Sequence, residues 1–124
     1  MINNIVLSPL PHTWIFDVDG TLCIHNGYKN GNDKLLKGVK SLFNKISLDD
    51  FIIILTSRHE SDKEHLEHFL QQHNLRYNYI IYDVPVGERI LVNDIKPSGL
   101  KTAYAINKIR DAQLSVNFSI DDNL

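Results

Sequence analysis

The residues best suited to chemistry are two aspartates, Asp17 and Asp19, which close an apolar run in TWIFDVDGTLC (13–23). Carboxylates this close repel and raise each other's pKa unless a cation or a reaction compensates them. Gly20 then allows a sharp turn and close approach to a ligand, and the backbone N–H groups of the turn up to Thr21 can form an anion-binding nest. The stretch predicts a polar ligand site, with a plain strand-end turn as the alternative.

Two later apolar runs also end in polar groups: FIIIL (51–55) and RILVND (89–94). In parallel α/β sheets, ligands bind beyond the carboxyl ends of the strands. If these strands are neighbours, we expect their polar ends to meet at one rim. The residues at these two ends are Thr56, Ser57 and Arg58, then Asn93 and Asp94.

Acids from separate strands in one pocket require a divalent cation. We expect Asp17, Asp19 and Asp94 to share it, and all-oxygen ligands beside a phosphate favour Mg²⁺. Thr56 would donate its hydroxyl to a phosphoryl oxygen, and Arg58 would place a cation nearby. Thr56 as a structural turn residue and Arg58 as an ordinary surface arginine remain alternatives.

The elements that position these groups follow from hydrophobic periodicity. Continuous apolar runs typical of strands covered on both faces occupy 13–19, 51–55, 79–83 and 89–94. Helical spacing occupies 33–47, 61–74, where Ser61 and Glu64 form a capping-box pair, and 98–112. Residues 25–33 are expected to form an exposed loop or a small hairpin, and 114–124 a late strand. This alternation predicts an α/β fold, a Rossmann-like three-layer sandwich around a mostly parallel sheet.

Composition excludes several classes. The 124 residues fit a single domain, 1–124, and the net charge of −2 with no basic stripe argues against nucleic-acid binding. The one cysteine, Cys23, permits no intramolecular disulfide. No signal peptide is evident, and no apolar run approaches the roughly 20 residues of a membrane span. We expect a cytoplasmic protein without membrane contact.

The motifs resemble those of the haloacid dehalogenase-like (HAD) phosphohydrolase superfamily. DVDGT (17–21) matches its first motif, Asp-x-Asp-Gly-Thr, at every fixed position. FIIILTS (51–57) is similar to its second motif, and RILVND (89–94) to its fourth. The resemblance covers roughly residues 13–110 and implies a phosphatase.

The resemblance also implies roles for single residues. Asp17 would be the nucleophile that forms an aspartyl-phosphate, and Asp19 the general acid and base. The Asp17 carboxylate, the Asp19 carbonyl and Asp94 would hold Mg²⁺, while Thr56 positions the phosphoryl group. Gly20, Thr21, Ser57 and Arg58 would line the substrate.

The chain departs from the family pattern at two places. The first residue of the acid pair often found in the fourth motif is Asn93, which leaves Asp94 to hold the metal. The third-motif lysine is missing from YDVPVGER (82–89). Arg89 begins the next predicted strand and should lie at the far end of the sheet, so Lys96 is the preferred substitute and Lys101 the second choice.

The spacing leaves no room for a cap domain. A capless, open site admits a large substrate or is closed by a second copy of the chain, so a homo-oligomer is one expectation. A looser resemblance to short capless HAD proteins of surface-polysaccharide synthesis favours a small sugar phosphate as substrate. Tyr77, Tyr79 and Tyr82 bracket an edge-like strand and are expected to pack rather than to form a ligand platform, with a subunit contact as one option.

Two other functions stay open. A catalytically degenerate HAD scaffold would bind metal or phosphate without turnover. A phospho-acceptor receiver domain is similar in length, but it would place its phosphorylated aspartate where this chain has Thr56 and Ser57.

Overall fold

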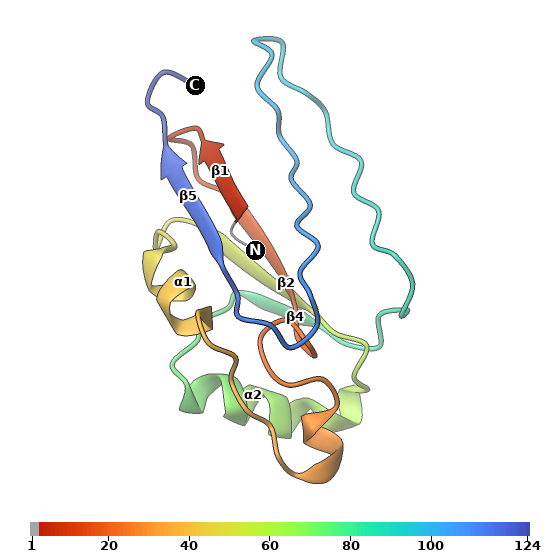
Figure 1. Cartoon of the computed structure of the whole chain (residues 1–124). Coiled ribbons are helices and arrows are strands. Elements are labelled where there is room, and N and C mark those ends of the chain that lie inside the picture. Colours follow the sequence, from red (N-terminus) through yellow and green to blue (C-terminus); the bar gives the residue numbers. More distant parts are fainter. Residues whose placement is uncertain (1–2) are drawn as a thin grey trace.

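The computed structural model describes residues 3–124 (Figure 1). It is an α/β fold whose strands form two small parallel sheets. Two α-helices and two short 3-10 helices, η1 and η2, connect β2 to β3 and β3 to β4. The elements in chain order are β1 Asn3–Leu7, β2 Thr13–Asp17, η1 Gly27–Asn30, α1 Val39–Lys45, β3 Phe51–Leu55, η2 Glu60–Asp62, α2 Lys63–Gln72, β4 Tyr79–Ile81 and β5 Val116–Ile120.

The three-stranded sheet has the order β2-β3-β4 and confirms the predicted parallel arrangement. Asp17 pairs with Leu55, and Leu55 pairs with Ile81. The predicted strand over 51–55 is confirmed at both ends, whereas β2 and β4 each stop two residues before the predicted ends. The register brings the carboxyl ends of all three strands to one rim.

The second sheet joins the two ends of the chain. β1 pairs in parallel with β5, from Asn3 opposite Val116 to Leu7 opposite Ile120. The late strand predicted within 114–124 is confirmed as β5, while β1 was not predicted. Figure 1 shows the two strands side by side, with their arrowheads pointing to the same end of the molecule.

One face of the β2-β3-β4 sheet carries the core. Ile52 and Ile54 are fully buried there with Phe16 of β2, and they pack with apolar residues of α1 and α2. The alternate residues point to the other face, where Ile15 is 48% exposed and Tyr79 62%. The structure therefore covers this sheet on one face more completely than on the other.

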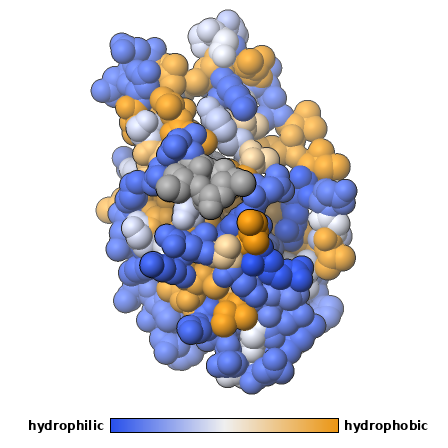
Figure 2. Space-filling view, viewed as in Figure 1, coloured by the Kyte–Doolittle hydropathy of each residue, from blue (hydrophilic) through white to orange (hydrophobic). Residues whose placement is uncertain are grey.

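Residues 84–112 differ from the prediction. The expected strand over 89–94 and helix over 98–112 are both absent from the structure, which gives neither element between β4 and β5. Ile90 is 86% exposed and Val92 89%. In Figure 1 the segment runs out and back as two extended arms, and Figure 2 shows apolar surface on that part of the molecule. These predictions were wrong because the apolar periodicity met no packing partner.

The helices differ in detail from their predicted beginnings. α1 begins after Gly38, which has φ of 91° and lies against the Leu114 carbonyl so closely that a Cβ would collide with it. The capping box predicted at Ser61 does not form, because η2 precedes α2 and Asp62 is the residue before the helix. Glycine at 38 therefore lets the chain leading into β5 pack against the beginning of α1.

A polar cluster fixes the amino ends of β2 and β3. Asp50 is buried and accepts hydrogen bonds from the His12 backbone N–H at 3.0 Å and the Trp14 indole at 3.0 Å. Burial acts to raise the pKa of Asp50, but these hydrogen bonds outweigh it and hold the pKa below its usual value. The cluster lies at the opposite end of these strands from their carboxyl ends.

Candidate functional site

Several predicted site residues meet at the carboxyl ends of β2 and β3. Asp17 ends β2 opposite Leu55, and Thr56 follows Leu55 directly. The Arg58 guanidinium reaches back across the rim to Asp19, with Nη2 2.9 Å from Oδ1. The prediction that these two runs end at one rim is therefore confirmed.

The turn after β2 is tight and closed on itself. Gly20 has φ of 85°, a conformation that favours glycine. Its N–H donates to the Cys23 carbonyl at 2.7 Å, and the Thr21 N–H donates to the Val18 carbonyl at 3.1 Å. The predicted anion nest is wrong for these two donors, because both are already engaged within the turn.

Asp17 remains open to solvent, with a side chain 37% exposed. The Thr21 hydroxyl donates to Oδ2 at 3.0 Å, and Arg89 Nη1 donates to Oδ1 at 3.3 Å. Each carboxylate oxygen therefore has one donor, which orients the group. The position predicted for Arg89 was wrong: without a strand over 89–94, its guanidinium reaches the rim.

Arg58 is the centre of the most buried polar cluster in this region, and its own side chain is fully buried. It forms a bidentate pair with Asp19, with Nε 3.0 Å from Oδ2 and Nη2 2.9 Å from Oδ1. A second bidentate pair joins Asp33, at 3.2 and 3.1 Å. Asp62 accepts from Nη1 at 3.0 Å, and the Tyr28 ring lies 3.9 Å from the guanidinium carbon.

The charge of Arg58 ties three separate parts of the chain together. Burial acts to lower its pKa, but hydrogen bonds and the charges of Asp19 and Asp33 outweigh burial and raise it. Arg58 is therefore a fixed cation that holds the 19–33 loop against the beginning of α2. His65 on α2 extends this cluster, with Nε2 2.9 Å from Asp33.

Asp19, Cys23 and Asp33 offer ligand atoms close enough together for one metal ion. Arg58 Nη2 contacts all three, at 2.9, 3.5 and 3.1 Å. Burial raises the pKa of the Cys23 thiol, and the charges of Asp33 and Asp19 raise it further, which disfavours the thiolate ligand. The guanidinium thus already supplies the positive charge that these acids require.

Thr56 and Ser57 lie on the rim, but their surroundings differ. Thr56 is 1% exposed, and its hydroxyl oxygen accepts from the Arg58 N–H at 3.0 Å. This is the structural turn role that sequence left open, although the hydroxyl retains a hydrogen to donate. Ser57 is half-buried beside it.

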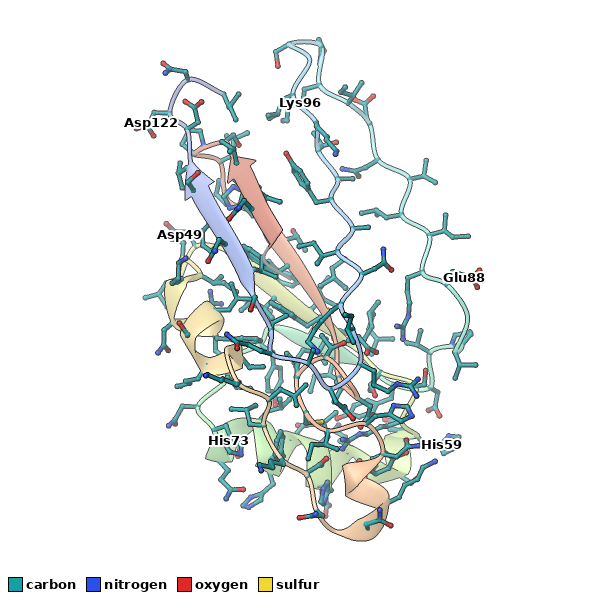
Figure 3. All side chains as sticks on the ribbon, in the orientation of Figure 1. Asp49, His59, His73, Glu88, Lys96 and Asp122 are labelled. Carbon is teal, nitrogen blue, oxygen red and sulfur yellow. The ribbon has the colours of Figure 1, made fainter. Side chains whose placement is uncertain are left out.

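The structure does not bring the remaining predicted residues to Asp17. Asp94 and Lys96 are exposed on the extended segment, and the backbone carbonyl of Asp94 accepts from Thr102. In Figure 3 Lys96 lies at the opposite end of the molecule from His59, which directly follows Arg58. Lys101 packs over Tyr104, at 4.6 Å from the ring centre. Asn93 donates to the Thr102 carbonyl at 3.1 Å.

Other cations border the turn instead. Lys108 Nζ donates to the Gly20 carbonyl at 2.9 Å, and burial lowers its pKa, an effect that Asp111 partly opposes. The Arg110 side chain lies against Gly20, where a Cβ would come within 3.1 Å of it. Arg89 and Lys108 therefore place charged groups near Asp17 and the adjoining turn, whereas Arg110 contacts the turn with the aliphatic part of its side chain.

These cations and the partners of Arg58 were missed by sequence reasoning. Lys108 and Arg110 fell within a predicted helix, so nothing indicated that they would reach Gly20. The spacing of Arg58 and Asp62, four residues apart, was a usable signal for an ion pair. Asp33 carried no such signal, because a turn-rich loop separates it from the strand.

A magnesium site is only partly assembled by these residues. The Asp17 carboxylate and the backbone of Asp19 belong to one turn, whereas Asp94 is exposed on the extended segment. Both acids of the turn already have arginine partners. The donor set around Asp17 therefore fits two of the three ligands that the family resemblance implies.

None of the helices in residues 3–124 has the length and apolar character needed to cross a membrane. Comparisons of the chain with protein-family models, with curated proteins and with solved structures found no match.

Proposed function

We propose that this chain is a Mg²⁺-dependent phosphomonoester hydrolase of the capless HAD type. Its substrate would be a small phosphorylated metabolite, such as a sugar phosphate of surface-polysaccharide synthesis. The observation that carries the proposal is the position of Asp17: an accessible carboxylate at the end of a parallel strand, oriented by Thr21 and bordered by cations. The parallel order β2-β3-β4 supports the finer assignment of a Rossmann-like fold.

The nucleophile would be an oxygen of Asp17. It attacks phosphorus in line, a new oxygen–phosphorus bond forms, and the bond from phosphorus to the leaving oxygen breaks. Since both oxygens of Asp17 have hydrogen-bond donors, the attacking atom is held in one direction before substrate arrives. Water then attacks the aspartyl-phosphate at phosphorus and releases inorganic phosphate.

The negative charge of the phosphoryl group requires fixed cations nearby. Arg89 contacts Asp17 itself, and the Lys108 ammonium lies at the Gly20 carbonyl. These two charged groups support phosphate recognition, in place of the third-motif lysine that the sequence lacks. The role predicted for Lys96 stays a prediction. Lys96 could take it up only if the 84–112 segment rearranged.

Asp19 would donate a proton to the leaving oxygen and then accept one from the attacking water. In the structure Arg58 holds both of its carboxylate oxygens. Asp19 must therefore separate from Arg58 before it transfers a proton. Mg²⁺, when held by Asp17, the Asp19 carbonyl and Asp94, would supply charge neutralisation at the phosphoryl oxygens.

The arginine partners of the two acids favour one second candidate, a scaffold that binds phosphate without turnover. If Asp19 stays with Arg58 throughout, the leaving oxygen has no proton donor. If Asp94 stays on the extended segment, the metal lacks its third ligand. These two observations are the specific support for the degenerate reading.

The test is a phosphate-release assay with and without Mg²⁺ on sugar, sugar-acid and amino-alcohol phosphates. Turnover that Asp17→Asn abolishes, and that the exposed control Asp122→Asn retains, supports the hydrolase. Absence of turnover with intact phosphate binding supports the scaffold. A stable acyl phosphate without turnover identifies a receiver domain instead.

A further inference from the structure

A concave region lies apart from Asp17, on the flank of the molecule formed by η2, α2 and β4. It is an open groove with a volume of about 330 Å³, within the range of small-molecule sites. The lining combines acids, a lysine and aromatic rings. The residues that matter here are Glu60, Lys63, Glu67, Tyr77, Tyr79 and Tyr82.

Glu67 places a negative charge in the groove. The residue is half-buried, and its carboxylate accepts a hydrogen bond from the Tyr82 hydroxyl at 3.1 Å. Across residues 3–124, no lysine, arginine or histidine nitrogen lies within ion-pair distance of it. A partly buried carboxylate with a hydrogen bond but no counter-ion attracts a cation more strongly than an exposed one does.

The pKa values of Tyr77 and Tyr82 are raised by burial and by the same negative charge. Burial raises the pKa of Tyr82, and its hydrogen bond to Glu67 raises the pKa further. Burial and the charge of Glu67 likewise raise the pKa of Tyr77. Both side chains therefore stay neutral, and they line the same groove as the carboxylate, with the Tyr82 hydroxyl directed at it.

Aromatic faces next to a carboxylate form the usual recognition site for an ammonium group. The rings contact the alkyl surface of the cation, and the carboxylate supplies the opposite charge. Lys63 is the chain's own nearest competitor, since it lines the groove one helical turn before Glu67. Its side chain is exposed and does not form that pair in the structure.

We propose that this groove binds an alkylammonium group of a small molecule, with Glu67 as the counter-charge and the tyrosine rings as the walls. This site is separate from the proposed phosphatase site, and the proposal does not depend on phosphatase activity. Tyr77 and Tyr82 also pack against the core, as expected, and the proposal adds a binding role to that packing. A second copy of the chain on the exposed β4 edge is the competing occupant.

The test is an NMR titration of protein with ¹³C-labelled tyrosine rings. The probe is choline, and the matched control is 3,3-dimethyl-1-butanol, which has the same shape without the charge. Choline should shift the ring signals of Tyr77, Tyr79 and Tyr82, and the neutral alcohol should not at the same concentration. Equal shifts with both compounds, or none with choline, would overturn the proposal.

Variants sharpen the result. Glu67→Gln should weaken choline binding roughly tenfold or more, because the counter-charge is lost. Tyr82→Phe keeps the ring and should retain binding, which guards against a fold defect in the first variant. Lys63→Gln should bind at least as tightly as the parent, since it removes the competing cation. Sedimentation showing a dimer that Tyr79→Ser disrupts, with no choline shift, would assign the surface to a second copy.

Discussion

Residues 13–82 and residues 84–112 both carry apolar patterns that predict strands and helices, but only the first region forms these elements in the structure. In the first region, FIIIL (51–55) becomes a strand with Ile52 and Ile54 fully buried. In the second, RILVND (89–94) stays extended, with Val92 89% exposed. The contrast shows that an apolar run becomes a strand only where a neighbouring strand and a covering helix are available.

The two regions also differ in how their polar groups are satisfied. In the first, Arg58 and Asp50 each connect elements distant in sequence through buried hydrogen bonds. In the second, the long-range hydrogen bonds include those from Arg89 to Asp17 and from Lys108 to the Gly20 carbonyl, which are half-buried or exposed. The outer part, residues 93–102, has local hydrogen bonds: the Thr102 hydroxyl donates to the Asp94 carbonyl, and the Lys96 N–H donates to the Leu100 carbonyl. Buried long-range polar contacts fix the first region, whereas the outer part of the second depends on a short turn at its tip.

The largest expected effect is on stability, and it differs between the two arginines that contact the predicted catalytic acids. Arg58→Ala leaves Asp19, Asp33 and Asp62 without their shared counter-ion, and it should lower the free energy of unfolding by about 3–5 kcal/mol. Arg89→Ala removes a half-exposed pair from the extended segment and should cost about 0–1 kcal/mol. Urea denaturation measures both, and equal losses would contradict the contrast.

A matched pair of isoleucines tests packing alone. Ile54→Ala opens a cavity under the β2-β3-β4 sheet and should cost about 2–5 kcal/mol. Ile90→Ala removes a side chain that is 86% exposed and should change stability by about 0.5 kcal/mol or less. The measurement is again the urea midpoint. A large loss for Ile90→Ala would mean that the segment packs against the rest of the protein in solution.

Much of the first region could be predicted from sequence, for physical reasons. Strands such as 51–55 and the apolar stripe of α2 carry their own periodicity, and the parallel order follows from the helices between them. The polar ends at Asp17 and Thr56 then follow from the strand boundaries. This is why half of the candidate site could be located without a structure.

The rest depended on contacts that no local pattern encodes. Asp33 reaches Arg58 from a loop, and Lys108 reaches Gly20 from 88 residues away. The position of Asp94 depended on a strand whose partner the sequence could not specify. β1 was missed because the strand is only five residues long and its partner, β5, lies at the other end of the chain.

A smaller effect on stability is expected at low pH, from the protonation of Asp50 at the amino ends of β2 and β3. Because the folded pKa of Asp50 is lowered, its stabilising contribution is present above its unfolded pKa of about 4 and is lost as pH falls through the folded value. Asp50→Asn should cost about 1–3 kcal/mol at pH 7, since an amide replaces the carboxylate that accepts from His12 and Trp14.

The measurement for this third prediction is stability against pH for the parent and the variant. The two curves should approach each other below about pH 4, where the parent loses the ionised carboxylate. A constant difference from pH 7 to pH 2 would show that the charge of Asp50 does not contribute. Asp49→Asn, at the exposed neighbouring position, is the control and should follow the parent curve.

The smallest expected quantity is the protection of the 84–112 segment against amide hydrogen exchange. The amides of residues 86–95 have no strand partner, so they should exchange at nearly the unprotected rate, while those of Ile52 and Ile54 exchange only on global unfolding. The Gly99 amide, bonded to the Lys96 carbonyl at 2.8 Å, is the internal reference for weak protection. One outcome is that Mg²⁺ with phosphate slows exchange of the 89–95 amides, whereas choline and substrate do not. That outcome would support closure of the segment over Asp17, with Asp94 brought into the site. If neither protects it, catalysis must depend on the residues already at the rim.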